Sequence, residues 1–543
     1  MEPTIKQQTI SNTNPNPYNA NNTVGYSQQP LSTAPVRSKR SFSFVENVYA
    51  WLSLLFGYLF CRVFPIADSP FGGLLFTLML FISAFVVIKI KGSKIGAKPI
   101  IVALSAIIIS ATLIITSNAF LHFFSYAYSL VIFCYFVYSA LGNSVKSGFS
   151  DLIVADFLKA LFVLPFCSFG YMFRALFSGK AKGSGKVFLK VLIGIAIAIV
   201  PTIVVFVLLS YDNNFIKLIN NIFDFNLDEF WSHIGSLILG VPIGLYIYGL
   251  FISSVDKKCK NVLNEDSCRK VINSMRIAPV ATIIAATAPV LFLYVVFFIS
   301  QWKYYVSGFT GVLPDDFSYA DYAREGFFQL CTVSVINLIL ILAVILFIKA
   351  DNKLGQVLNK IVVILFSLST LILISTAISK MAMYINTYGL TPKRVYATWL
   401  MLLIALIFLI ISVRQFVVKL KAVAVSLVVT VIMFSFVALP NVDGIIAKYN
   451  VGRYLEGSLL TVDIDAMEEL GSSAIPSLIV LAKPLENKGR SKTLEENSLY
   501  NEVTQYLNNV ANEIKESEKD IFSFTLPDAM AEKALKEYGY LEQ

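Results

Sequence analysis

The sequence predicts an all-α polytopic integral membrane protein, with about eleven transmembrane helices and a small helical C-terminal extracytoplasmic region. Two properties of the 543-residue chain lead to this class: 56% of its residues are hydrophobic, and only 15% are charged. Soluble domains carry roughly a quarter charged residues. The third observation is a series of uncharged apolar runs that are each long enough to cross a bilayer.

Charge separates the chain into two parts. Residues 1–439 contain 34 lysines and arginines against 17 aspartates and glutamates, whereas residues 440–543 contain 10 against 18. The positive charges are spread over short loops between apolar runs, which is typical of loops beside an anionic cytoplasmic leaflet. We therefore expect the lipid bilayer to surround the chain, and we expect no nucleic acid as a partner.

The first 41 residues are rich in asparagine, proline, glutamine and serine. Such a segment has too little apolar surface to offset the entropy of ordering the chain, so residues 1–41 are predicted to be a disordered cytoplasmic tail. This polar start also lacks the apolar core of a cleavable signal peptide.

Residues 42–439 are predicted to form the transmembrane bundle. The expected spans lie at about 45–64, 71–89, 99–117, 119–140, 187–210, 232–254, 277–300, 326–348, 361–383, 395–413 and 422–439. The stretch 150–178 is also apolar, but it carries Asp151, Asp156, Lys159 and Arg174. Because its uncharged core is short for a crossing, we interpret 150–178 as an interfacial or re-entrant helix.

Lysines and arginines recur in every second loop of this bundle. Short basic loops remain in the cytoplasm, so the N-terminus is predicted to be cytoplasmic and residues 440–543 to be extracytoplasmic. This acidic tail is predicted to be helical near 442–455, 464–470, 474–483, 494–519 and 528–540.

The composition gives no support for a metal, a cofactor or a disulfide framework. The six cysteines fall mostly in apolar runs without a C-x-x-C pair, and the chain has only two histidines. Zinc sites and disulfide scaffolds need denser ligands or pairs than these. No aspartate or glutamate lies near the centre of an expected span, which disfavours a proton-coupled transporter.

The first candidate site is the polar connection 301–326, which the charge pattern places on the outer face. Its carboxylates and its arginine could bind a cation, a headgroup phosphate or the acidic tail. A solvated loop explains the same residues without a ligand. The candidates here are Asp315, Asp316, Arg324 and Glu325.

The second candidate site is the connection 384–394 between the ninth and tenth spans. Gly389 fits the end of one helix, and Thr391 with Pro392 fits the start of the next. Lys380, Tyr384 and Tyr388 recur at helical spacing on one face. Together with Arg394 they could face an anionic headgroup, although snorkelling near a helix end explains Lys380 equally well.

Several outer-face segments resemble a known family. The residues that carry the resemblance are GFTG at 308–311, SYADYAREGFF at 318–328, YGLT at 388–391, NVD at 441–443, AKYN at 447–450 and RYL at 453–455, with Pro314, Tyr384 and Arg394. They are similar to bacterial multi-pass membrane proteins catalogued as domain of unknown function 4173, related to type 4153. The resemblance covers roughly residues 45–480 and implies a location in the bacterial cell membrane, but it implies no activity.

Three classes of function remain open at this point. The first is a non-enzymatic sensor, scaffold or accessory subunit that binds an envelope protein or a lipid headgroup at its outer face, with Arg453 added to the candidate residues. The second is a transporter or flippase of a lipid-like or zwitterionic substrate, for which Gln329, Asn337, Thr376 and Lys380 would line a hydrated cavity. The third is a membrane enzyme acting on a lipid-linked substrate, with Asp315 and Asp316 as metal ligands or general base.

Overall fold

The computed structural model describes residues 40–64, 69–146, 148–176, 227–259, 262–300, 327–350, 352–516 and 520–542, with a few isolated positions at 201–215 and at 302. The chain divides into two compact units, Met1–Ser41 and Phe42–Gln543. Only Arg40 and Ser41 of the first unit are described, so the predicted disorder of residues 1–41 lies outside the described residues. The account below concerns the second unit.

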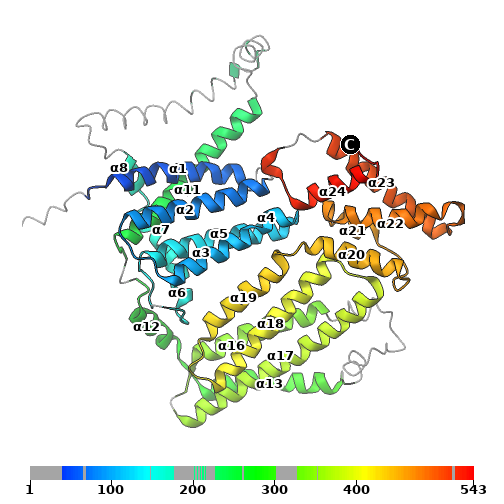
Figure 1. Cartoon of the computed structure of the whole chain (residues 1–543). Coiled ribbons are helices and arrows are strands. Elements are labelled where there is room, and N and C mark those ends of the chain that lie inside the picture. Colours follow the sequence, from blue (N-terminus) through cyan, green and yellow to red (C-terminus); the bar gives the residue numbers. More distant parts are fainter. Residues whose placement is uncertain are drawn as a thin grey trace, which may run out of the picture. The chain divides into compact units, whose positions relative to one another are not determined.

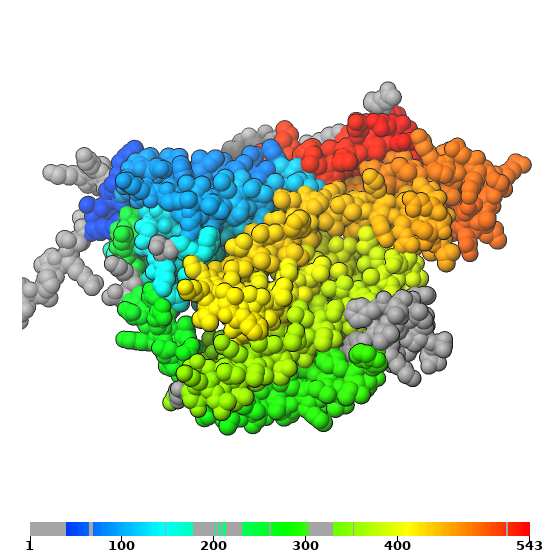
Figure 2. Space-filling view, turned by 60° about the horizontal axis from the view of Figure 1, so that its bottom comes forward, coloured from blue at the N-terminus to red at the C-terminus, as the bar shows by residue number. Residues whose placement is uncertain are grey.

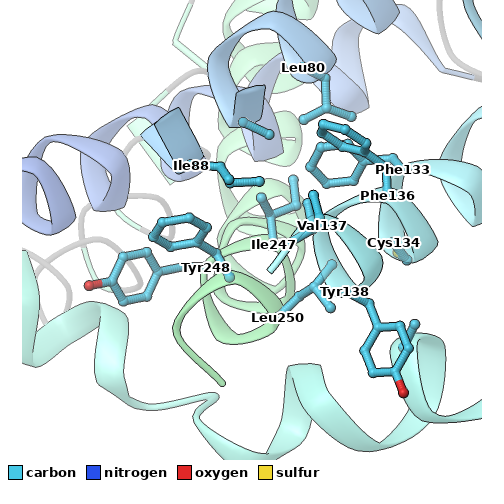
Figure 3. Close-up of a cluster of buried hydrophobic side chains, with 14 of the residues drawn as sticks. Leu80, Ile88, Phe133, Cys134, Phe136, Val137, Tyr138, Ile247, Tyr248 and Leu250 are labelled. Carbon is cyan, nitrogen blue, oxygen red and sulfur yellow. The ribbon is translucent and has the colours of Figure 1, made fainter. Parts of the chain in front are cut away.

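The N-terminal half of this unit is a helical bundle with its own core (Figure 1). Its long helices are α1 (Phe44–Val63), α2 (Pro70–Ile90), α3 (Ala97–Ser110) with the short α4 (Thr112–Ile115), α5 (Ala119–Ala140) and α11 (Leu227–Val255). Leu80 and Ile88 of α2 meet Phe133 and Val137 of α5 in this core (Figure 3). Burying these side chains against one another defines how the helices are arranged.

Glycines allow α1 and α11 to approach closely. A Cβ atom added to Gly57 would lie 2.0 Å from the carbonyl oxygen of Gly240, and one added to Gly244 would lie 2.8 Å from the oxygen of Ser53. Small residues at helix contacts are how membrane helices gain close packing without a hydrophobic driving force.

The stretch 150–178 is a broken helical segment. It contains α6 (Ile153–Leu158), a π-helical turn η1 (Lys159–Val163), α7 (Leu164–Cys167) and α8 (Tyr171–Leu176). Near its start, Asp151 accepts a hydrogen bond from the amide of Val423, and near its end Tyr171 packs against Phe42. An interfacial or re-entrant role for this segment stays a prediction.

A disulfide joins Cys167 of this segment to Cys259 after α11. The cysteine spacing gives no support for a disulfide framework, and it does not predict this single pair. The two residues are 92 positions apart. Their proximity depends on how α7 packs against α11, which residue spacing does not reveal.

The C-terminal half is a second bundle with a separate core. Its elements are α12 (Glu265–Met275), α13 (Val280–Ser300), α16 (Phe327–Phe347), α17 (Lys353–Tyr388), α18 (Pro392–Phe416) and α19 (Ala422–Ala438). The two-residue strands β1 (Ala278–Pro279) and β2 (Ile348–Lys349) pair in parallel just before α13 and after α16. Asn337 of α16 accepts a hydrogen bond from Tyr294 and donates one to Thr370, so it joins three helices.

Nine helices in the described part of the chain are long and apolar enough to cross a membrane. A tenth arises if α19 and the next helix, which meet at 55°, count as one span. The predicted span 187–210 lies almost entirely outside the described residues. An all-α, multi-pass membrane protein is therefore confirmed, whereas the count of eleven is not.

Beyond α19 the chain forms a C-terminal helical module. It comprises α20 (Val442–Leu455), α21 (Ile464–Glu468), η2 (Gly471–Ala474), α22 (Ile475–Asn487), η3 (Gly489–Ser491), α23 (Leu494–Glu516), η4 (Ile521–Ser523) and α24 (Leu526–Glu537). Its apolar faces pack around Ile475, Leu478 and Val503 in a core that also includes Leu121 of α5 and Val437 of α19. All five helices expected in the tail are present, and the side chain of Asp463 caps α21 by accepting the amide of Ala466.

The two ends of the bundle carry different features: lysine–glutamate ion pairs at one and the C-terminal module at the other. At one end, here called the basic end, Lys91 pairs with Glu46 at 2.7 Å and Lys146 pairs with Glu265 at 2.8 Å. The other, here called the module end, carries α20–α24. The module contacts helices of both halves there, through α18 on one side and through α2 and α4 on the other (Figures 1 and 2). Which end faces the cytoplasm stays a prediction.

Candidate functional site

Four of the nine candidate residues fall between α13 and α16, in a connection that the structure does not describe. Asp315, Asp316, Arg324 and Glu325 therefore lie outside the described residues. The site below is built from the other candidates, which belong to α17, α18 and α20.

The turn between α17 and α18 is defined by local sequence. Helix α17 ends at Gly389, whose φ of +76° suits a residue without a side chain. The hydroxyl of Thr391 then accepts the amide of Arg394 and opens α18, with Pro392 in the first turn. The predicted helix stop and helix start are both confirmed.

Two tyrosines and an arginine meet at this turn. The rings of Tyr384 and Tyr388 pack edge to face, with centroids 5.2 Å apart. The guanidinium carbon of Arg394 lies 4.1 Å from the centre of the Tyr384 ring, within cation–π range. Arg394 also donates to the carbonyl oxygens of Tyr388, at 3.0 Å, and Gly389. Since the last carbonyls of a helix lack helical partners, this arginine caps α17.

Helix α20 reaches the same turn through Asn450. The amide of Leu390 donates to Asn450 Oδ1 at 2.7 Å, and Asn450 Nδ2 donates back to the carbonyl of Leu390 at 2.8 Å. A Cβ atom on Gly389 would lie 2.5 Å from Asn450 Oδ1. The glycine is therefore required twice, for its backbone conformation and for the approach of Asn450.

Arg453 lies one turn further along α20. It donates to the side-chain and main-chain oxygens of Ser458, at 3.1 and 2.9 Å, and to the carbonyl of Ile385 in α17, at 3.4 Å. Its guanidinium therefore connects the end of α20 with the last turn of α17.

The structure thus brings together most of the candidates that it describes. We call this set the module-end cluster: Tyr384, Tyr388, Arg394, Asn450 and Arg453. Asn450 was not predicted, although it lies in the AKYN segment that carries the family resemblance. Lys380 lies one turn before Tyr384 on α17 and is half-buried.

A second polar contact ties α20 to the N-terminal half. Asp443, only 2% exposed, accepts a hydrogen bond of 3.0 Å from Asn118, the N-cap residue of α5. The other carboxylate oxygen of Asp443 and the hydroxyl of Tyr396 are buried without a hydrogen-bond partner among the described residues. Sequence reasoning missed this contact because its two members are 325 residues apart.

A third polar cluster lies at the basic end. Asp156 is 1% exposed, and its Oδ1 accepts hydrogen bonds from the Tyr138 hydroxyl, at 2.8 Å, and the Val145 amide, at 2.9 Å. The Tyr138 hydroxyl points away from the apolar core (Figure 3). Burial raises the pKa of the Asp156 carboxyl, against the opposing effects of these two donors and of the Lys98 and Lys159 ammonium groups.

The described polar contacts at the module end are attachments. Arg394 donates to the main-chain carbonyl of Tyr388, and Arg453 donates to that of Ser458. Among the described residues, no three His, Cys, Asp or Glu side chains are grouped to hold a metal ion. Asn337 is fully buried between Tyr294 and Thr370, and Thr376 bonds back to the carbonyl of Ile372. These groups join or bend helices, as polar residues in spans commonly do.

Comparison with known proteins identifies the family of this chain. Residues 103–481 match the family described as domain of unknown function (DUF4153). The match includes the α17–α18 turn and α20, so the two halves of the module-end cluster belong to one family region. The label 4173 that the motifs suggested is not confirmed. No curated protein and no solved structure matched the chain. Because the match spans well over half of its length, the chain belongs to the DUF4153 family.

Proposed function

We propose that this protein is a non-enzymatic sensor or scaffold subunit, whose C-terminal module binds an envelope partner at the outer face of the membrane. The observation that carries the proposal is the module-end cluster. Arg453 and Asn450 attach the module to the α17–α18 turn, and Arg394 caps α17 at that turn.

The attachment reaches both halves of the bundle. Asn450 and Arg453 hold α20 on the α17–α18 turn, and Asp443 holds the start of α20 on Asn118 of α5. Further along, the ring of Phe522 in η4 packs near Gly72 at the start of α2. A partner that pulled or tilted the module would therefore act on both halves together, which is what a membrane sensor or scaffold needs.

The module also presents exposed apolar side chains beside charged ones. Leu460 is 93% exposed and Leu494 is 91% exposed. Glu456, Asp463 and Asp465 lie close to Leu460 in sequence, whereas Leu494 lies between basic residues and Glu495, and Glu496 pairs with Lys488. Large exposed leucines beside charged side chains fit a partner surface that combines apolar contacts with complementary charges.

The test is photo-crosslinking in living cells. A photo-reactive amino acid is placed at Leu460 or at Leu494, and at Phe436 of α19 as a control, which is 69% exposed but lies on a predicted membrane span. We expect a discrete protein adduct from Leu460 or Leu494 that weakens at high salt, and only lipid adducts from Phe436. No discrete adduct from either leucine would contradict the proposal.

A further inference from the structure

A cleft of about 620 Å³ lies along the seam between the two halves. Helices α3 and α5 line it from the N-terminal half, and α18 and α19 line it from the C-terminal half. Its walls are almost wholly apolar and include Val102, Ile132, Trp399, Leu427 and Val431. We call it the seam cleft.

Most polar side chains in its walls already have partners, but the buried hydroxyl of Tyr135 has none among the described residues. Ser105 Oγ and Tyr128 Oη are 2.7 Å apart and hydrogen-bonded to each other. The hydroxyl of Thr430 donates to the carbonyl of Ser426, and Trp399 Nε1 donates to the carbonyl of Met433. The walls therefore suit an apolar occupant, because these partnered groups do not require water or a polar ligand.

The seam cleft opens sideways. Ile101 of α3 and Ile432 of α19 line it and are 59% and 50% exposed. Exposed apolar residues on membrane-spanning helices face acyl chains, so lipid has lateral access to the cleft. Residues near both ends of α19 line the cleft. The cleft therefore runs along most of this helix, whose 17 residues span about 25 Å.

Its basic end carries positive charge. Lys98 Nζ lies 5.3 Å from the ring centre of Tyr135 and 5.4 Å from that of Phe149, and both rings line the cleft. Lys421, which is exposed, directly precedes α19, and the exposed Lys419 lies two residues earlier.

Two acidic groups lie nearby. The exposed Asp151 carboxylate accepts the Val423 amide at the N-terminus of α19, and the buried Asp156 accepts the Tyr138 hydroxyl and the Val145 amide. Lys98 also donates to the carbonyl of Gly148. Because Lys98, Lys419 and Lys421 outnumber the one exposed carboxylate at the mouth of the cleft, this end favours an anion.

We propose that the seam cleft holds an acyl chain of one anionic phospholipid, whose phosphate lies at Lys98 and Lys421. The volume is in the range of about 300–1,000 Å³ that encloses ligands of this size class. Because the basic end is expected to face the cytoplasm, the lipid comes from the inner leaflet. This inference goes beyond the proposed function and does not depend on a protein partner.

The test is native mass spectrometry of the full-length protein released from bilayers with equal amounts of phosphatidylglycerol and phosphatidylethanolamine. We expect one retained lipid, with phosphatidylglycerol preferred by about tenfold or more. Lys98→Gln and Lys421→Gln should each lower this preference by about fivefold. Ala127→Phe and Val428→Trp, which fill the cleft, should abolish retention.

Matched controls separate the cleft from the general surface. Lys94→Gln removes an exposed charge of the same basic end, and Ala286→Phe adds a ring to an exposed face of α13; both should retain lipid as the wild type does. Equal retention of the two lipids would overturn the proposal. So would undiminished retention in a cleft-filling variant that elutes and melts like a folded protein.

Discussion

The module-end cluster and the seam cleft use opposite kinds of residue. The cluster gathers tyrosines, arginines and an asparagine, whose side chains bond main-chain groups at helix ends and turns. The cleft is made of ordinary valines, leucines and aromatic rings, yet it leaves a cavity of about 620 Å³. Polar side chains that stand out in the sequence therefore form an attachment, whereas common apolar side chains line the cavity.

The difference follows from what each region must satisfy. Backbone carbonyls at a helix end and a glycine turn need hydrogen-bond donors, so polar side chains are drawn there. Two apolar helix bundles that meet along a seam need no such donors, and a gap between them can be occupied by lipid. The predictions below test this contrast, starting with the largest expected effect.

Gly389→Ala should break the cluster. The new Cβ would meet Asn450 Oδ1 at 2.5 Å, and a φ of +76° is strained for any residue with a side chain. We expect a loss of about 3 kcal/mol in stability and faster proteolysis of the module. The control, Gly452→Ala in α20, meets no atom within 4 Å and should gain about 0.5 kcal/mol. Equal melting temperatures for the two variants would contradict the cluster's role.

A substitution of alanine by phenylalanine should lower stability more in a packed core than in the seam cleft. Ala377 of α17 is fully buried in the core of the C-terminal half, so Ala377→Phe should cost about 2 kcal/mol through overpacking. Ala127→Phe enters the seam cleft and should cost less than about 1 kcal/mol in the same thermal melt. If Ala127→Phe were as damaging as Ala377→Phe, the cleft would not be open.

Arg453→Lys should weaken the attachment moderately. Lysine keeps the charge but lacks the planar fork that reaches both Ser458 and the carbonyl of Ile385. We expect a loss of about 1 kcal/mol, measured by thermal unfolding. Lys448→Gln, an exposed change on the same helix, should have no measurable effect. An unchanged Arg453→Lys variant would show that the bonds to Ser458 and Ile385 contribute nothing.

The smallest effect concerns pH. The pKa of Asp156 is raised in the folded protein by burial, so its stabilising contribution is greatest below the unfolded pKa of about 3.9 and is lost as pH rises through the folded pKa. Asp156→Asn retains an Oδ1 acceptor for Tyr138 and Val145 but cannot ionise. Relative to the wild type, its melting temperature should therefore rise as the pH increases above about 4. A constant difference would contradict the assigned shift.

Local patterns in the sequence predicted most of the fold. Apolar runs gave the positions of the spans, and Gly389, Thr391 and Pro392 gave the α17–α18 turn, because each depends on neighbouring residues alone. The sequence predicts Lys380, Tyr384, Tyr388 and Arg394 as one site, with Arg453 as a further candidate. The role of the cluster as an attachment was not predicted, because Asn450 and Leu390 are 60 residues apart and their pairing depends on tertiary packing.

The seam cleft could not be predicted at all. Its lining residues have the composition of any membrane helix, and the cavity arises only from how α19 is placed beside α3 and α5. The Cys167–Cys259 disulfide and the Asn118–Asp443 contact escaped prediction for the same reason. Side chains that meet across long sequence separations leave no periodic pattern.

The most direct test of the account is the side of the membrane on which the module lies. Leu460→Cys on the module and Lys94→Cys at the basic end, both at exposed positions, are labelled in intact cells with a membrane-impermeant maleimide. The account predicts that Leu460→Cys reacts from outside and that Lys94→Cys reacts only after the cells are permeabilised. The reverse pattern would contradict it, because the module would then face the cytoplasm and the lysines of the seam cleft would face the outer leaflet.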